Sequence, residues 1–134
     1  MTTEAKYGAL IVEDEPLGRR RLRELIKEVS WLECLGETSN GPAAVAAIDE
    51  LHPDLVFLDI RLPGCSGLEV LARISHVPGV IFTTAHDSFA VSAFELGALD
   101  YLLKPFGRER FAKALERARV SLDRDAEPAA GERA

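Results

Sequence analysis

The sequence predicts an α/β fold, a (βα)5 chain whose five strands form one doubly wound parallel sheet. Short, solidly apolar runs alternate along the chain with longer segments in which apolar residues recur at helical spacing. Three of the apolar runs lack the polar–apolar alternation of a half-exposed strand, which is typical of strands buried on both faces of a parallel sheet. Strands that alternate with helices join through right-handed crossovers, so we expect helices on both faces of the sheet.

The apolar runs predict the five strands, and the apolar stripes predict the helices. The runs are Ala9 to Val12, Glu33 to Gly36, Leu55 to Leu58, Val80 to Phe82, and Leu99 to Leu103. The stripes are Leu22, Leu25, Ile26 and Val29; Val45, Ile48 and Leu51; Leu68, Leu71 and Ile74; Phe89, Ala93 and Leu96; and Phe111, Ala114, Leu115 and Ala118. Pro16 suits a first helical turn, Gly41-Pro42 opens the second helix, and Gly97 fits just beyond the fourth.

The 134 residues are expected to form one domain followed by a solvated segment. Residues 1–121 carry the whole strand–helix pattern, whereas residues 122–134 have no periodic apolar stripe. We therefore place the domain at 1–121 and a linker or disordered tail at 122–134.

The composition argues against a membrane protein and against a surface that binds nucleic acid. No apolar run approaches the roughly 20 residues of a membrane span, and the first apolar stretch is shorter than the about 7 to 15 residues of a signal peptide. We therefore expect a cytoplasmic protein without membrane contact. The net charge of −6 and the pI near 5.1 are unlike those of nucleic-acid-binding domains, so DNA would be reached through something else.

The cysteines predict no special chemistry. Cys34 and Cys65 are the only two, and no histidine or further thiol has the spacing of a zinc site. We expect Cys34 to be buried in its apolar stretch and Cys65 to be a partly exposed thiol in a loop.

Polar side chains follow the predicted strands where these strands end. They are Glu13, Asp14 and Glu15 after the first strand, Asp59 after the third, Thr83 and Thr84 after the fourth, and Lys104 after the fifth. Ligands of such sheets bind outside the carboxyl ends of the strands. Each residue alone has a simpler explanation as a helix cap, a turn residue or a surface cation. Their coincidence at one edge of the sheet favours a functional site.

Three carboxylates at one edge need a compensating cation. Two like charges about 4 Å apart repel by about 4 kcal/mol at an effective dielectric constant of about 20, so Glu13, Asp14 and Asp59 would not stay ionised together on their own. All-oxygen ligation suits Mg²⁺, with Mn²⁺ as the alternative. Lys104 and Thr84 would then bind the oxygens of a phosphoryl group beside the metal.

Asp59 is the best candidate for a nucleophile that accepts this phosphoryl group. It follows the most apolar run, Leu55 to Leu58, and a rigid strand aims it at the site, whereas Glu13 and Asp14 open a loop and look like metal ligands. A carboxylate that attacks phosphorus forms an acyl phosphate.

From residue 8 to about 121, the chain resembles the receiver domain of two-component response regulators. The matching motifs are Leu10-Ile11-Val12-Glu13-Asp14-Glu15-Pro16, Pro53 to Pro63, Gly67, Thr83-Thr84-Ala85 and Asp100 to Phe106. The stretch from Thr84 to Glu95, followed by Gly97 to Tyr101, further resembles receivers of LytTR-type transcription regulators. The resemblance implies a flavodoxin-like strand order, 2-1-3-4-5.

The resemblance makes Asp59 the phosphoacceptor for a sensor histidine kinase. Asp14 would bind the metal directly, Glu13 largely through water, and Arg61 through its backbone carbonyl. The chain departs from the family pattern at Glu13, where aspartate is commoner. The departure lengthens the side chain by a methylene and keeps its charge.

The resemblance also assigns the residues that respond to the phosphoryl group. Thr84 and Lys104 would bind its oxygens, Lys104-Pro105 would be a cis peptide, and Tyr101 would be the aromatic switch residue, turning inward on phosphorylation. A homodimer is expected on phosphorylation, through the face of the fourth helix, fifth strand and fifth helix. The apolar residues of that face would be Phe89, Val91, Phe94 and Leu96.

Two further expectations concern turnover and lifetime. The domain would be no enzyme in the usual sense, because it would catalyse only its own phosphorylation and dephosphorylation. Arg61 and His86 would border the path of water to the acyl phosphate, and neither is suited to orienting an attacking water. We therefore expect slow autodephosphorylation.

Two other classes of phosphate-binding protein and a pseudo-receiver fit the sequence less well. A haloacid-dehalogenase-like phosphatase needs a second aspartate two residues after its nucleophile, where this chain has Arg61, and Glu13-Asp14-Glu15 would repel the phosphate of a flavodoxin-like electron carrier. A pseudo-receiver would not need Asp59, Thr84 and Lys104 together. Two outputs stay open: transcription through a DNA-binding domain outside this chain, or a stand-alone regulator that acts by protein–protein contact.

Overall fold

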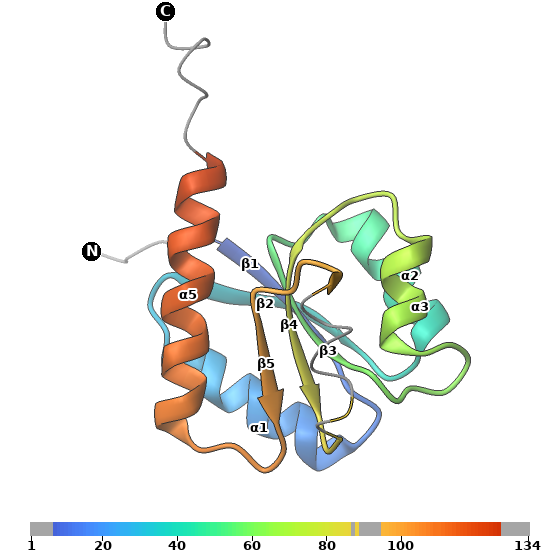
Figure 1. Cartoon of the computed structure of the whole chain (residues 1–134), viewed down its shortest axis with the longest axis horizontal. Coiled ribbons are helices and arrows are strands. Elements are labelled where there is room, and N and C mark those ends of the chain that lie inside the picture. The colour runs from blue at the N-terminus through green and yellow to red at the C-terminus, as the bar shows by residue number, and fades with distance from the viewer. Residues whose placement is uncertain (1–6, 87, 89–94, 127–134) are drawn as a thin grey trace, which may run out of the picture.

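The computed structural model describes residues 7–86, 88 and 95–126, which include a sheet of five parallel strands in the order β2-β1-β3-β4-β5 (Figure 1). The strands are β1 (Tyr7–Val12), β2 (Leu32–Thr38), β3 (Leu55–Asp59), β4 (Gly79–Thr84) and β5 (Asp100–Leu103). The helices are α1 (Pro16–Lys27), α2 (Gly41–Leu51), α3 (Gly67–Arg73) and α5 (Arg108–Ala126). The predicted fold class and strand order are confirmed.

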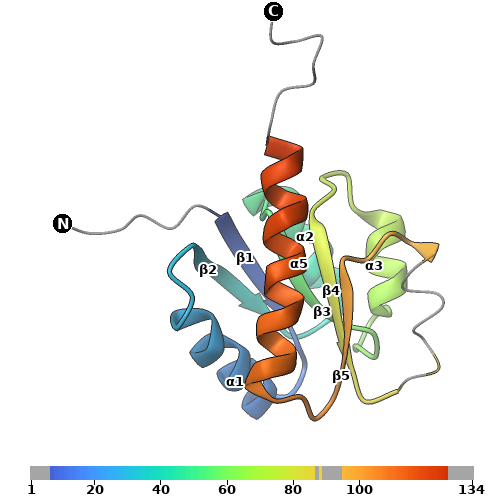
Figure 2. The same ribbon diagram turned by 60° about the vertical axis from the view of Figure 1, so that its left-hand side comes forward.

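Alternate residues of the central strands face opposite helical layers. Ala9 and Ile11 of β1 pack with α1 and α5, whereas Leu10 and Val12 pack with α2 and α3. Figures 1 and 2 show the same division, with α1 and α5 on one face of the sheet and α2 and α3 on the other. Every residue of β1 and β3 is buried, as their continuous apolar runs predict.

Both expectations about the cysteines were wrong. Cys34 is exposed because β2 lies at the edge of the sheet, where most of its residues face solvent or are half-buried. Cys65 is buried because its loop folds over the start of α2, so closely that a Cβ on Gly41 would lie 2.3 Å from the Cys65 sulfur. Neither position could be judged from the local apolar pattern alone.

Local hydrogen bonds fix the helix starts near the functional edge. The Asn40 side chain accepts from the backbone N–H of Ala43 at 2.8 Å and caps α2. Ser66 and Glu69 form a capping box at the start of α3. Gly67 is required here, because a Cβ would lie 2.3 Å from the backbone carbonyl oxygen of Asp59. The close approach of α3 to the end of β3 therefore depends on this glycine.

The last helix extends beyond the start of the predicted linker. Helix α5 continues to Ala126, and Leu122 is buried in the core. The Tyr7 hydroxyl donates to Asp123 at 2.6 Å, which ties the start of β1 to the end of α5. The helix therefore includes residues 122–126, although their sequence shows no repeated stripe. The division into a domain and a linker stays a prediction.

Much of the predicted fourth helix lies outside the described residues, including Phe89, Val91, Ala93 and Phe94. Leu96 is 51% exposed, and Gly97 has a positive φ of 80°. Across the part of the chain that the structure describes, the helices are all too short or too polar to span a bilayer.

Candidate functional site

The ends of four strands bring the predicted site residues to one edge of the sheet. Glu13 directly follows β1, Asp59 ends β3, Thr84 ends β4, and Lys104 directly follows β5. The backbone N–H of Lys104 donates to the carbonyl of Thr84 at 2.7 Å, which continues the pairing of β4 with β5. In Figure 1 the arrowheads of β4 and β5 point to this edge, beside α1.

Three carboxylates meet there. Each of Glu13, Asp14 and Asp59 offers an oxygen within 4.8 Å of the others. Glu13 is fully buried and Asp59 is 6% exposed, whereas Asp14 is exposed. A set of carboxylate oxygens open to water on one side fits the preference of Mg²⁺ and Mn²⁺ for oxygen ligands with retained waters. The residues present therefore fit such a cation.

Lys104 neutralises part of this acidic cluster. Its Nζ donates to Glu13 Oε1 and, at 3.0 Å, to Asp59 Oδ2. Burial alone would lower the pKa of Lys104, but the hydrogen bonds to Glu13 and Asp59 and the charges of both carboxylates outweigh it and raise the pKa. Asp59 Oδ1 accepts from the backbone N–H of Arg61 at 3.2 Å. Both oxygens of Asp59 are thus oriented by donors.

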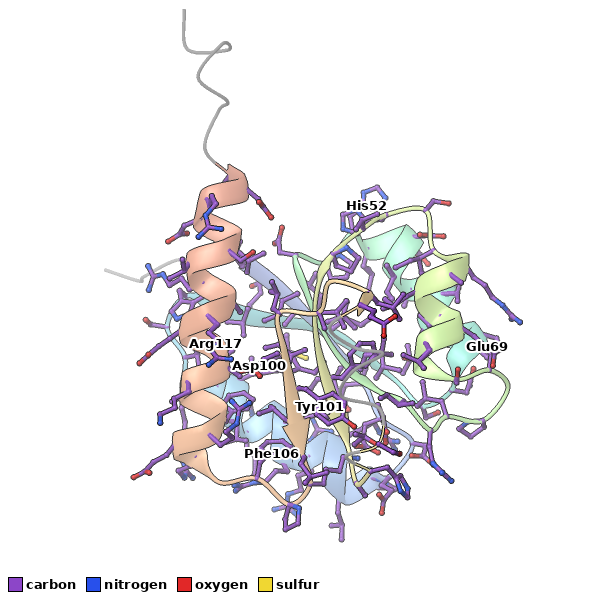
Figure 3. The ribbon with its side chains drawn as sticks, viewed as in Figure 1. His52, Glu69, Asp100, Tyr101, Phe106 and Arg117 are labelled. Atoms are coloured by element: carbon purple, nitrogen blue, oxygen red, sulfur yellow. The ribbon has the colours of Figure 1, made fainter. Side chains whose placement is uncertain are left out.

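A second group of contacts connects Thr84 to Tyr101. Thr84 is fully buried, and its Oγ1 accepts from the backbone N–H of His86 at 3.3 Å. The Tyr101 hydroxyl donates to the His86 carbonyl. The Tyr101 ring is only 9% exposed, so it already lies inward in this structure. Figure 3 shows Tyr101 on β5, with Phe106 beyond it toward the carboxyl edge.

The other predicted site features are found at the same edge. The Lys104–Pro105 peptide bond is cis, which is the form that the resemblance implies. The Arg61 and His86 side chains are exposed beside the buried site residues. A cavity of about 300 Å³ adjoins the site on the α1 side. Its lining includes Glu13, Lys104, Leu17, Gly18, Pro105 and Phe106.

The sequence interpretation missed residues of α1 that hold Glu13. Arg19 donates from Nη1 to the backbone carbonyl of Glu13 at 2.9 Å. The backbone N–H of Glu15 donates to Glu13 Oε2 at 3.2 Å. Gly18 faces the Glu13 side chain, and a Cβ there would lie 2.9 Å from its Cδ. A glycine inside a helix is unfavourable, so Gly18 was the one signal available in the sequence.

Comparison with known families shows which protein family the chain belongs to. A family model described as the response regulator receiver domain matches residues 9–116. The chain belongs to this family. The resemblance inferred from the motifs is therefore confirmed at the level of the receiver domain, and the LytTR-type subfamily stays a prediction.

Curated relatives of this receiver domain include transcriptional regulators. The transcriptional regulatory protein BtsR of Escherichia coli K12 is 46% identical over 112 residues, which are 82% of this chain and 47% of BtsR. The positive alginate biosynthesis regulatory protein of Pseudomonas aeruginosa is 48% identical over 115 residues, which are 83% of this chain and 46% of that protein. The receiver chain spans about half the length of these relatives.

Solved receiver structures have the same fold. The response regulatory domain of mrkE from Klebsiella pneumoniae matches with a TM-score of 0.80 and 32% identity, over 87% of this chain and 98% of that one. A DNA-binding response regulator of the LuxR family from Staphylococcus aureus matches with a TM-score of 0.75 and 32% identity, over 84% and 98% of the two chains. This chain therefore has the same receiver fold as these two response regulators.

Proposed function

We propose that this receiver domain accepts a phosphoryl group on Asp59 from a sensor histidine kinase in the cytoplasm. The observation that carries the proposal is the placement of Asp59 at the end of a buried strand, 3.0 Å from the Lys104 ammonium and within a cluster of carboxylates. A carboxylate so placed is oriented by a rigid element, and a cation lies where negative charge arrives.

The residues of this chain have separate tasks in the transfer. A carboxylate oxygen of Asp59 forms a bond to phosphorus while the bond from phosphorus to the donor breaks, and the donor keeps that electron pair. Lys104 remains beside Asp59 and balances the charge of the incoming oxygens. The Thr84 hydroxyl already accepts from the His86 N–H, so its own hydrogen can be donated to a phosphoryl oxygen.

Glu13, Asp14, Asp59 and the backbone carbonyl of Arg61 would hold a Mg²⁺ ion, or Mn²⁺ in its place. The ion would neutralise the carboxylates and the phosphoryl oxygens, which lowers the repulsion between two anions. Glu13 and Asp59 are buried and Asp14 is exposed. The cation site would thus have buried carboxylates on its inner side and access to water on its outer side.

Intact-mass measurement tests the acceptor directly. With Mg²⁺ and acetyl phosphate the protein should gain one acid-labile phosphoryl group, and Asp59→Asn should abolish the gain. Asp125→Asn is the matched control, because it makes the same change at an exposed position of α5. An equal gain on the Asp59→Asn protein would show that another residue is the nucleophile.

We infer that the output of this domain is transcription, through a DNA-binding domain outside this chain and of the LytTR type. BtsR, which is about twice as long as this chain, is named a transcriptional regulatory protein, and this supports an effector domain over a stand-alone regulator. The net charge of −6 also gives this domain little attraction for DNA.

Phosphorylation is proposed to act through Thr84 and Tyr101 on the face of the predicted fourth helix, β5 and α5, and to favour a homodimer. The Tyr101 ring already lies inward in this structure. Phosphorylation would therefore act by lowering the population of a state in which the ring points outward. Sedimentation with and without beryllofluoride tests this step. The same oligomeric state under both conditions would rule out dimerisation driven by phosphorylation.

We further propose that Arg61 and His86 slow the hydrolysis of the phosphorylated state. Both side chains are exposed, whereas Asp59 and Thr84, each two residues earlier in the chain, are buried. The loss of phosphate from purified phosphoprotein should be faster in the double variant Arg61→Asn with His86→Ala than in the parent. An unchanged or slower loss would remove the shielding role.

A further inference from the structure

Glu13 occupies a tightly defined position beneath the site. The residue is fully buried, and each of its carboxylate oxygens has a donor: Lys104 Nζ on Oε1, and the Glu15 N–H on Oε2 at 3.2 Å. Its backbone carbonyl accepts from Arg19 at 2.9 Å. A small displacement of this side chain would therefore break contacts with both the lysine and the backbone.

Gly18 leaves the space that the Glu13 side chain fills. A Cβ on Gly18 would lie 2.9 Å from both Cγ and Cδ of Glu13 and 3.0 Å from Oε1. Contacts this short force the Glu13 side chain to move, and that movement takes its carboxylate away from its two donors. Gly18 is in the first turn of α1, and alanine is the better helix former, so helix propensity alone would favour alanine at this position.

The backbone gives no other reason for glycine at this place. Among the described glycines, Gly64 and Gly97 have a positive φ, and Gly18 does not. Its helical conformation is open to any residue, so what distinguishes the position is the contact with Glu13. The cavity beside the site is lined by Gly18 together with Glu13 and Lys104, which places all three around one space.

We propose that Gly18 is a positioning residue that permits glutamate at position 13 and so keeps Lys104 held between Glu13 and Asp59. The inference rests on the proposed transfer to Asp59, because Lys104 serves that step. A side chain at position 18 displaces the Glu13 carboxylate, and Lys104 then loses one of its two acidic partners. A shorter residue at position 13 removes this conflict.

A double-mutant cycle on stability tests the pairing without metal or phosphate. The melting temperature is measured in EDTA for the parent, Gly18→Ala, Glu13→Ala and the double variant. Gly18→Ala should raise the unfolding equilibrium constant of the parent about tenfold, as expected for residues in contact. In the Glu13→Ala background the same change should leave the melting temperature unchanged or raise it, because the three Glu13 atoms that lie nearest to the new Cβ are absent.

Two further measurements connect the pairing to the site. Gly18→Ala should lower both the affinity for Mn²⁺ and the rate of phosphorylation by acetyl phosphate. Both decreases should be smaller when the Glu13→Asp protein is compared with the double variant Glu13→Asp with Gly18→Ala. Gly107→Ala is the matched control, because a Cβ there meets nothing within 4 Å. It should change neither quantity.

The outcomes separate this inference from the proposed function. Equal effects of Gly18→Ala in the parent and in the Glu13→Ala background would overturn the pairing, even if the parent is phosphorylated normally. Coupling in the stability cycle, together with a parent that takes up no phosphate, would overturn the transfer to Asp59 and leave the pairing in place. A Gly18→Ala protein that fails to fold, beside a double variant that folds, would support the pairing; failure of both to fold would refute it.

Discussion

Replacement of Lys104 by methionine should destabilise the protein without metal and much less with it. Lys104→Met keeps the aliphatic part of the side chain and removes the ammonium that contacts Glu13 Oε1 and Asp59 Oδ2. Those carboxylates are 0% and 8% exposed in their side chains, so water reaches them poorly once the cation is gone. The variant therefore leaves two buried negative charges facing each other.

The contacts set the size of the effect. Two charge-assisted hydrogen bonds are lost, each worth about 1.5 to 3 kcal/mol. The Lys104 side chain is 22% exposed and Asp14 beside it is open to water, so screening places the sum at the lower end, about 3 kcal/mol. For a chain of 134 residues this corresponds to a melting temperature lower by roughly 10 °C.

Thermal unfolding followed by circular dichroism at neutral pH measures the effect, once in EDTA and once in saturating Mg²⁺. The bound cation neutralises the same carboxylates, so the difference in melting temperature between parent and variant should be smaller in Mg²⁺ than in EDTA. Lys113→Met serves as the control, because it removes an exposed lysine of α5 and should behave like the parent. A gap that is equally wide in EDTA and in Mg²⁺, or a variant that melts with the parent in EDTA, would refute the neutralising role of Lys104.

Three other contacts hold the scaffold around the site, and substitutions test each of them. Asp100 is 2% exposed and accepts from Arg110 at 2.7 and 2.9 Å. Arg117 of α5 forms an ion pair with it at 3.6 Å, and Figure 3 labels both residues. Burial alone would raise the pKa of Asp100, but the hydrogen bonds from Arg110 and the Tyr101 N–H and the charges of Arg110 and Arg117 hold it below its usual value. Urea unfolding of Asp100→Asn should therefore show a loss of about 2 kcal/mol at neutral pH. A carboxylate with a lowered pKa stabilises the fold above its unfolded-state pKa of about 3.9, and this stabilisation disappears as pH falls through the folded-state pKa. The free energies of unfolding of parent and variant should therefore converge in acid. A difference that stays constant with pH would contradict the assignment. Tyr7→Phe removes the bond to Asp123 and should lower the free energy of unfolding by about 1 kcal/mol, with faster amide exchange confined to the last turns of α5. Ser66→Ala should lower it by about 1 kcal/mol through loss of the α3 cap, whereas Ser66→Asp, which keeps an acceptor, should retain most of the stability.

The central part of the fold could be predicted because burial on both faces leaves a strong local signal. Leu55 to Leu58 form a continuous apolar run, and every residue of β3 is buried. The edges were less predictable, since edge strands and helix ends depend on what packs on them. Strand β2 is longer than its predicted run, and Cys34 is exposed on it. Leu122 is buried by packing against the core, although the sequence around it has no apolar repeat that predicts this.

The candidate site shows the same limit at the level of single side chains. The sequence order placed Glu13, Asp14, Asp59, Thr84 and Lys104 at one edge because the carboxyl ends of parallel strands coincide, and that argument needs no coordinates. It could not say which partner Lys104 would take, since distances between side chains depend on rotamers and on residues brought in from other elements. Gly18 is such a residue: in the sequence it is an unfavourable glycine in a helix, and in the structure it lies against the one acidic residue that departs from the family pattern. The longer Glu13 and the missing side chain of Gly18 are therefore best understood together, as one adjustment of the space next to Lys104.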